Sequence, residues 1–105
     1  MVFTKISPDQ VELDVLRLAL RCAHEAGLTD NYLVTHHSLS ARKLRLIRNG
    51  VSVKARLVYL AKLADAIECK RQRLVMSGRS GEAQALKDKL YDILLLFMAR
   101  HRDLK

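Results

Sequence analysis

Apolar residues recur every three or four positions along most of this chain, and no segment shows the two-residue alternation of a strand. The first periodic run follows the capping sequence Ser7-Pro8-Asp9-Gln10 and continues to about Ala26. A later run follows Ser52, which can cap it, and extends to Met76. The last run covers residues 82–102, after a short Gly- and Ser-containing linker. The pattern therefore predicts an all-α chain in which these runs form the first, fourth and fifth helices.

Between the first and fourth helices, residues 27–50 have the pattern of two short helices joined by a tight turn. Thr29 is placed to cap one helix and Ser40 to cap the other, with the turn at Ser38 and Leu39. Gly50 supplies the left-handed residue that ends the second of these helices. The residues expected to face inward are Leu33, Leu44 and Ile47.

The second of these short helices is cationic on its outward side. Arg42, Lys43, Arg45 and Arg48 surround its apolar stripe, and the whole chain of 105 residues carries a formal net charge of +8. A surplus of this size on a small domain favours an anionic partner. A short, capped, cationic helix set on another helix by a tight turn has the shape that enters a major groove.

The spacing of residues 27–50 resembles the helix-turn-helix of the Cro and phage-repressor type, also called the xenobiotic-response-element type. The positions that carry the resemblance are Gly27, Leu28, Thr29, Leu33, Leu39, Ser40, Leu44, Ile47 and Gly50. The resemblance continues loosely into the apolar positions of the fourth helix and covers about half of the chain. This chain has Asp30 where that family often has Gln, Val34 where it usually has a small residue, and Ser38 where it usually has Gly.

The resemblance implies that the chain binds double-stranded DNA with the helix after the turn lying in the major groove. By position, the residues that it places at base edges are Ala41, Arg42, Arg45 and Leu46. Arg42 and Arg45 lie three residues apart on one helix face, and each can bond to O6 and N7 of guanine. The expected phosphate contacts, at helix N-termini, the helix flank and the following loop, are Thr29, Ser40, Lys43, Arg48, Asn49, Lys54 and Arg56.

The fifth helix carries more apolar residues than one packed face requires. A heptad seam runs through Ala83, Leu86, Leu90, Ile93 and Phe97, and further apolar residues follow Ile93. We interpret this surplus as a homodimer interface formed by Leu86, Leu90, Ile93, Leu94 and Phe97. Such a dimer would place two recognition helices about 34 Å apart and would require a palindromic operator. The alternative is a central core helix that the other four helices surround.

Other kinds of chemistry find little support. Cys22, His24, His36 and His37 have no metal-ligand spacing, and the chain has no nucleophile-elbow, catalytic-Cys or phosphate-loop signature. We therefore expect neither an enzyme nor a cofactor or metal. The longest apolar run, residues 93–99, is too short to span a bilayer, and there is no signal-peptide pattern, so we expect a cytoplasmic protein with free Cys22 and Cys69.

The sequence thus predicts one all-α domain over residues 1–105, acting as a small dimeric, repressor-like transcriptional regulator that binds a specific DNA sequence. The main alternative is a protein-binding module, such as an antitoxin or adaptor, that grips a partner through its C-terminal helices. Asp30 and Ser38 favour this alternative, because both depart from the DNA-binding pattern. A third possibility, RNA binding, is weakened by the scarcity of aromatic residues for base stacking.

Overall fold

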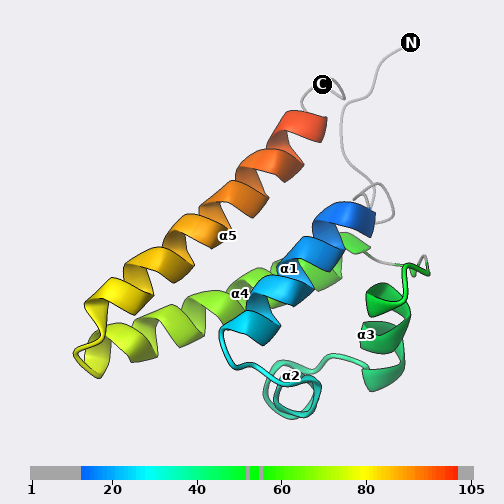
Figure 1. Cartoon of the computed structure of the whole chain (residues 1–105). Coiled ribbons are helices and arrows are strands. Elements are labelled where there is room, and N and C mark those ends of the chain that lie inside the picture. Colours follow the sequence, from blue (N-terminus) through cyan, green and yellow to red (C-terminus); the bar gives the residue numbers. More distant parts are fainter. Residues whose placement is uncertain (1–12, 52, 55, 102–105) are drawn as a thin grey trace.

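Helices account for most of the residues that the computed structural model describes, which are 13–51, 53–54 and 56–101. They are α1 (Leu13–Glu25), α2 (Asp30–His37), α3 (Ala41–Arg48), α4 (Arg56–Met76) and α5 (Ser80–His101) (Figure 1). Within these ranges there are five helices and no strand, so the prediction of an all-α, five-helix fold is confirmed.

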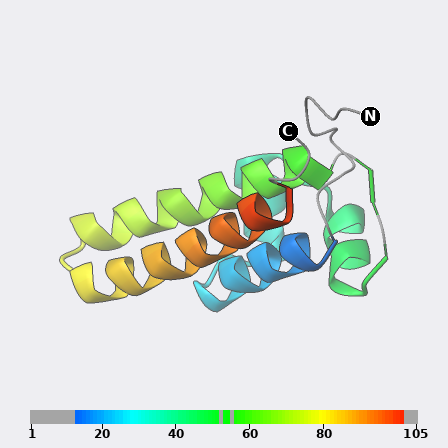
Figure 2. The same cartoon turned by 90° about the horizontal axis from the view of Figure 1, so that it is seen from above.

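The two long helices α4 and α5 form an antiparallel hairpin, and α1 packs against both (Figures 1 and 2). The short helix α2 lies on the side of α1 and α4 that faces away from α5. The other short helix, α3, lies at the end of the molecule that is remote from the α4–α5 turn. The fold is elongated, with extents of 51 × 28 × 19 Å, and α3 lies at one end of its long axis (Figures 1 and 2).

Glycines with left-handed backbone end α1, α3 and α4, as the helix-stop pattern predicts for the first two. Gly50 has φ +79°, its N–H donates to the Ile47 carbonyl at 3.0 Å, and the N–H of Val51 donates to the Leu46 carbonyl at 2.9 Å. These two bonds satisfy carbonyls at the end of α3 that would otherwise have no partner in the helix. Gly27 ends α1 in the same way, with φ +90°.

The start of α4 differs from the prediction. The helix begins at Arg56 rather than directly after Ser52, because Val53 lies outside the helix with its side chain packed into the core, only 7% exposed. The guanidinium of Arg56 donates to the Val53 carbonyl at 3.1 Å and closes this turn. The predicted caps at residue 52 and at residues 7–10 lie outside the described residues.

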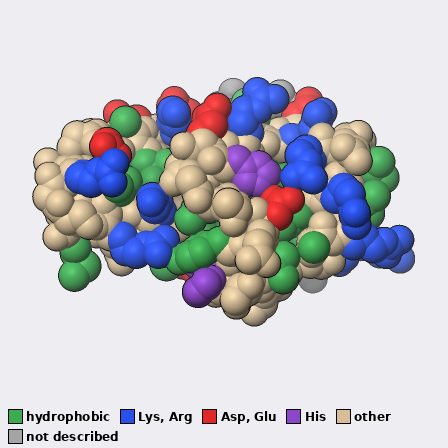
Figure 3. All heavy atoms as spheres, turned by 60° about the horizontal axis from the view of Figure 1, so that its bottom comes forward, with side chains coloured by type: hydrophobic (Ala, Val, Ile, Leu, Met, Phe, Trp, Pro, Cys, Tyr) green, Lys and Arg blue, Asp and Glu red, His purple; other side chains and the backbone are tan. Residues whose placement is uncertain are grey.

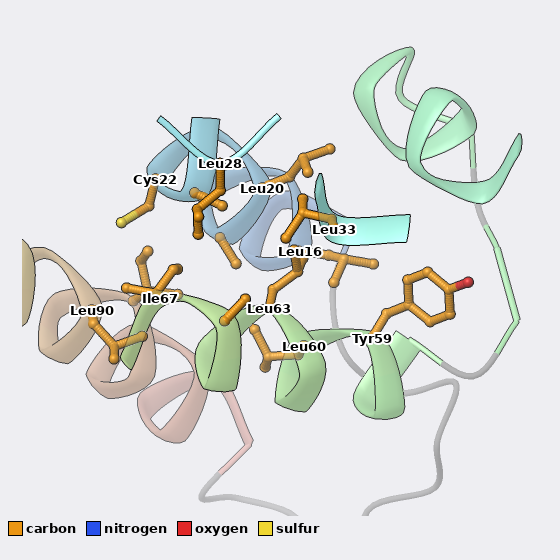
Figure 4. Packing of buried hydrophobic residues seen from close by; sticks show 14 of the residues in the cluster. Leu16, Leu20, Cys22, Leu28, Leu33, Tyr59, Leu60, Leu63, Ile67 and Leu90 are labelled. Carbon is orange, nitrogen blue, oxygen red and sulfur yellow. The ribbon is translucent and has the colours of Figure 1, made fainter. Parts of the chain in front are cut away.

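Aliphatic side chains from α1, α2 and α4 meet at the centre of the core. Leu16, Leu33 and Leu63, one from each helix, are all fully buried and lie close together (Figure 4). Burying each such leucine contributes about 1.5–3 kcal/mol. Leu33 is the one fully buried residue of α2, so it anchors that helix, and through the turn it positions α3.

The heptad seam of α5 packs inside the chain, so its assignment to a dimer interface was wrong for most of its residues. Leu86, Leu90 and Ile93 are each only 7% exposed, and Leu94 and Phe97 are partly buried against the same core. The alternative, in which α5 is a central helix surrounded by the other four, is wrong as well, since α5 lies on the outside of α1 and α4 (Figure 2). The large apolar residues that α5 exposes, within the described part of the helix, are Tyr91, Leu95 and Met98.

Candidate nucleic-acid interface

The recognition-helix candidate α3 has sharply different inner and outer faces. Leu44 and Ile47 are completely buried, which fixes how the helix rotates about its own axis. Arg42 and Arg45 consequently point outward and are exposed, and neither has an ion-pair or hydrogen-bond partner among the residues that the structure describes. The two guanidinium groups are therefore available to a ligand.

The chain around α3 carries positive charge with no acid of its own. From Asn31 to Ala64 there is no Asp or Glu, whereas Lys and Arg occur at Arg42, Lys43, Arg45, Arg48, Lys54, Arg56 and Lys62. Figure 3 shows Lys and Arg side chains gathered at the end of the molecule where α3 lies. A surface with one sign of charge concentrates ions of the opposite sign and speeds their association.

The N-terminus of α3 is held in place by two hydroxyl groups. The Ser40 hydroxyl accepts from the Lys43 N–H at 3.3 Å, so Ser40 is the predicted cap. The Ser40 N–H in turn donates to the Tyr59 hydroxyl of α4 at 3.0 Å. Figure 4 shows Tyr59 with its hydroxyl pointing away from the aliphatic cluster, and the Lys43 ammonium lies 5.2 Å from its ring centroid. Tyr59 thereby ties α3 to the core helix α4.

A Tyr59→Phe protein should unfold about 0.5–1.5 kcal/mol more easily, because the part-buried Ser40 N–H loses its acceptor while the ring stays in place. Thermal unfolding followed by circular dichroism measures this loss. Tyr91→Phe is the matched control, since Tyr91 is 57% exposed. Equal melting temperatures for the two variants would contradict the role given to the Tyr59 hydroxyl.

The turn between α2 and α3 uses a serine in a left-handed conformation. Ser38 has φ +58° and is the only non-glycine residue with positive φ in the described ranges. Its carbonyl accepts from the Lys62 ammonium at 3.2 Å, and Leu39, the next residue, is 3% exposed. The predicted turn at Ser38 and Leu39 is therefore present, and contacts with α4 and the core hold it without the glycine that is usual at such positions.

A charged cluster braces α1, α2 and α3 against one another. Asp30, at the start of α2, accepts from Arg48 of α3 at 2.7 Å and lies 2.6 Å from Nε2 of His24 in α1. The Arg17 guanidinium donates to the Arg48 carbonyl at 3.3 Å. Arg48 was predicted as a phosphate contact. In this structure one nitrogen of its half-exposed guanidinium bonds to Asp30, so Arg48 braces α3 against α2, and its contact with phosphate stays a prediction.

The same cluster shifts the pKa of Asp30. Burial raises that pKa, but the hydrogen bonds and positive charge of Arg48 and His24 outweigh burial and hold the pKa of Asp30 below its ordinary value. The ionised carboxylate is thus the form that the folded chain prefers. Its charge is neutralised inside the protein, which reduces the repulsion that a bare Asp30 would exert on a nearby phosphate.

Replacing Asp30 with Asn should remove a pH-dependent part of the stability. A carboxyl whose pKa is lower in the folded chain adds stability above its unfolded pKa of about 3.9, and this part is lost as pH falls through the folded value. At pH 7 Asp30→Asn should therefore cost about 0.5–1 kcal/mol, discounted because both partners are partly solvent-exposed. Below about pH 3 the difference from wild type should shrink. Urea unfolding at pH 7 and pH 3 tests this, and a constant difference would contradict it.

The other predicted contact residues fall into two groups. Ala41 at the start of α3, Asn49 at its end and Lys54 in the following loop are exposed, as a contact surface requires. Four others have roles within the chain. Leu46 packs half-buried against the core, the Thr29 hydroxyl accepts from the Tyr32 N–H, the Ser40 hydroxyl caps α3, and Arg56 bonds to the Val53 carbonyl.

The residues that sequence reasoning missed are long-range partners. Tyr59 and Lys62 of α4 hold the turn and α3, and Arg73 of α4 donates to the Tyr32 hydroxyl of α2 at 2.6 Å. Tyr59 has one usable signal, since a tyrosine in an otherwise aliphatic helical run needs a partner for its hydroxyl. For Lys62 and Arg73 the sequence offers no signal.

Other site chemistry is sparse in the described part of the chain. Among those residues, no three or more His, Cys, Asp or Glu side chains lie together in a group that could hold a metal ion. Burial raises the pKa of the Cys22 thiol, which therefore stays protonated and is a poor nucleophile. Among the same residues, none of the helices combines the length and the hydropathy that a transmembrane segment needs.

Comparison of this chain with protein-family models, with curated proteins and with solved structures gave no match.

Proposed function

We propose that this protein binds double-stranded DNA through α3 and acts as a small, repressor-like transcriptional regulator. The observation that carries the proposal is the pair Arg42 and Arg45, exposed and unpartnered within the described chain on a helix whose other face is fully buried. Because Leu44 and Ile47 fix the rotation of α3, both arginine side chains leave the helix from the same outward face. Each can form a bidentate contact with guanine in the major groove.

The surroundings of α3 supply the phosphate contacts of this proposal. Lys43, Asn49 and Lys54 flank the two arginines on the segment that lacks acids. The N-terminus of α3 adds the positive end of the helix dipole, which favours a phosphate group. Because Ser40 and Thr29 use their hydroxyls as caps, they contribute by holding the two helix starts rather than by direct hydroxyl contacts.

The alternative of a protein-binding module loses two of its supports. Asp30 has a structural role in bracing α3, and Ser38 forms the turn with its carbonyl bonded to Lys62. Neither departure from the DNA-binding pattern therefore requires a second function to explain it. What still favours a protein partner is the apolar surface on α5, which a second copy of the chain would also cover.

The salt dependence of binding to a random-sequence duplex separates the two functions. A protein that makes about four phosphate contacts should lose about a hundredfold in affinity between 50 mM and 200 mM salt, because it releases condensed counterions. Fluorescence anisotropy of a labelled duplex measures the slope, and an unlabelled structured RNA serves as competitor. DNA binding would be contradicted if the protein did not bind the duplex at all. It would also be contradicted if the affinity for the duplex changed less than about threefold over this salt range.

A further inference from the structure

The helix α5 carries two apolar stripes on opposite sides. The inner stripe is the buried seam of Leu86, Leu90 and Ile93. The outer stripe consists of Tyr91, Leu95 and Met98, which are 57%, 60% and 61% exposed. Its spacing of four and then three residues keeps the three side chains on one line along the helix. In Figures 1 and 2 the other helices lie on the inner side of α5, so nothing in the described chain covers the outer stripe.

The outer stripe has the register of a two-stranded coiled coil. With Tyr91 and Met98 at d positions and Leu95 at the a position between them, Lys87 falls at g and Asp92 at the following e. In a parallel pair of helices, a g residue faces the e residue five positions further along the other helix. Lys87 and Asp92 are five positions apart and opposite in charge.

The two charged residues differ in their surroundings within the chain. Asp92 is exposed and forms no ion pair with any residue that the structure describes. Lys87 is half-buried, its ammonium lies 5.7 Å from the ring centroid of Tyr91 beside the stripe, and its charge helps to lower the pKa of Glu68 on α4. In an antiparallel pair, g would face g and e would face e, so Lys87 would meet Lys87 and Asp92 would meet Asp92. Charge therefore selects the parallel arrangement.

We propose that the occupant of the outer stripe is a second copy of this chain, packed with its α5 parallel to the first. Tyr91, Leu95 and Met98 of the two copies form the apolar contact, and two symmetry-related pairs of Lys87 with Asp92 flank it. The two-fold axis then runs along α5. Because α3 lies at the end of the molecule where α5 ends, both copies present α3 at the same end of the assembly (Figures 1 and 2). An antiparallel pair would place the two α3 helices at opposite ends.

The apolar contact between the two α5 helices is short, so the dimer that it forms is weak. From Tyr91 to Met98 the stripe spans two helical turns, about 10 Å. The preceding a position is Asp88, whose carboxylate accepts from the Gln84 amide at 2.9 Å and would face its own counterpart across the axis. Asp88 therefore ends the contact on that side. A contact this small gives a weak, concentration-dependent dimer, which binding of both copies to one DNA duplex would reinforce.

The biological use of this dimer rests on the proposed function, but the association is measured without DNA. Sedimentation equilibrium of the full chain from about 10 µM to 1 mM should show reversible monomer–dimer exchange. Lys87→Glu alone or Asp92→Lys alone should weaken the dimer about threefold to tenfold, since each creates two like-charge pairs. The combined variant Lys87→Glu/Asp92→Lys should recover wild-type association, because the opposite charges meet again.

Two further variants test the stripe itself. Leu95→Lys should abolish the dimer, whereas Met76→Lys, at an 87% exposed position on α4, should leave it intact. Circular dichroism confirms that each variant is folded. A wild-type chain that stays monomeric to 1 mM would overturn the proposal, as would single charge reversals that leave the dimer unchanged. If the chain is monomeric but still binds DNA with the expected salt dependence, only the dimer is refuted. If the chain dimerises but binds no DNA, only the proposed function is refuted.

Discussion

The Arg42→Ala/Arg45→Ala protein should bind its specific DNA site at least about thirtyfold more weakly than wild type, while its melting temperature stays the same. Each arginine that reads a guanine is worth about 1–3 kcal/mol, and about 1.4 kcal/mol is a factor of ten in affinity. Both side chains are exposed and unpartnered in the described chain, so removing them costs no internal contact. Fluorescence anisotropy with the selected site, at fixed salt, measures the change.

The control variant for this experiment must also remove two positive charges, but from a surface other than α3. Arg21→Ala/Lys70→Ala deletes two positive charges on α1 and α4, away from α3, and should weaken binding only through the smaller net charge. With a non-specific duplex, the α3 variant and the control should differ much less than with the specific site. If the two variants lost equal affinity for the specific site, α3 would not be the helix that reads the bases.

Leu63→Ala should destabilise the fold by about 2–5 kcal/mol, a large part of the roughly 5–15 kcal/mol that holds a domain together. Leu63 is completely buried where α1, α2 and α4 meet, so truncation leaves a cavity that three helices must share (Figure 4). Because Leu33 of α2 packs at the same place, the anchoring of the α2–α3 unit should loosen too. Urea unfolding monitored by circular dichroism gives the free energy.

An exposed methionine on the same helix provides the comparison. Met76→Ala, at the far end of α4, should change the unfolding free energy by less than about 0.5 kcal/mol. A Leu63→Ala protein as stable as the Met76→Ala protein would mean that the centre of the core lies elsewhere.

The local features of this fold could be predicted from the sequence because neighbouring residues determine them. Thr29 and Ser40 cap their helices through bonds that span only three residues, and Gly50 adopts the conformation that glycine favours at a helix end. The inward positions Leu44 and Ile47 follow from helical periodicity alone. The same periodicity places Arg42 and Arg45 on the outside, so the cationic face of α3 was also predictable.

The features that could not be predicted from the sequence depend on which helices pack against each other. The seam through Leu86 and Leu90 shows that one side of α5 is buried, but the spacing is the same whether the neighbour is α4 or a second chain. Asp30 and Arg48 lie 18 positions apart, and their ion pair exists only once α2 and α3 have docked. Periodicity shows which face of a helix is buried but not which element packs against that face, which is why the sequence did not reveal the pairing of Arg48 with Asp30.

Selection of bound sequences from a random duplex pool at about 150 mM salt tests whether α3 reads a specific DNA sequence. We expect enrichment of a two-fold symmetric site whose half-sites, about ten base pairs apart, contain guanines that the Arg42→Ala/Arg45→Ala protein no longer distinguishes. Enrichment of a single half-site would still support α3 as the reader and would remove the dimer. A pool that stays random after repeated rounds, with only weak, salt-sensitive retention, would contradict sequence-specific DNA binding by this protein.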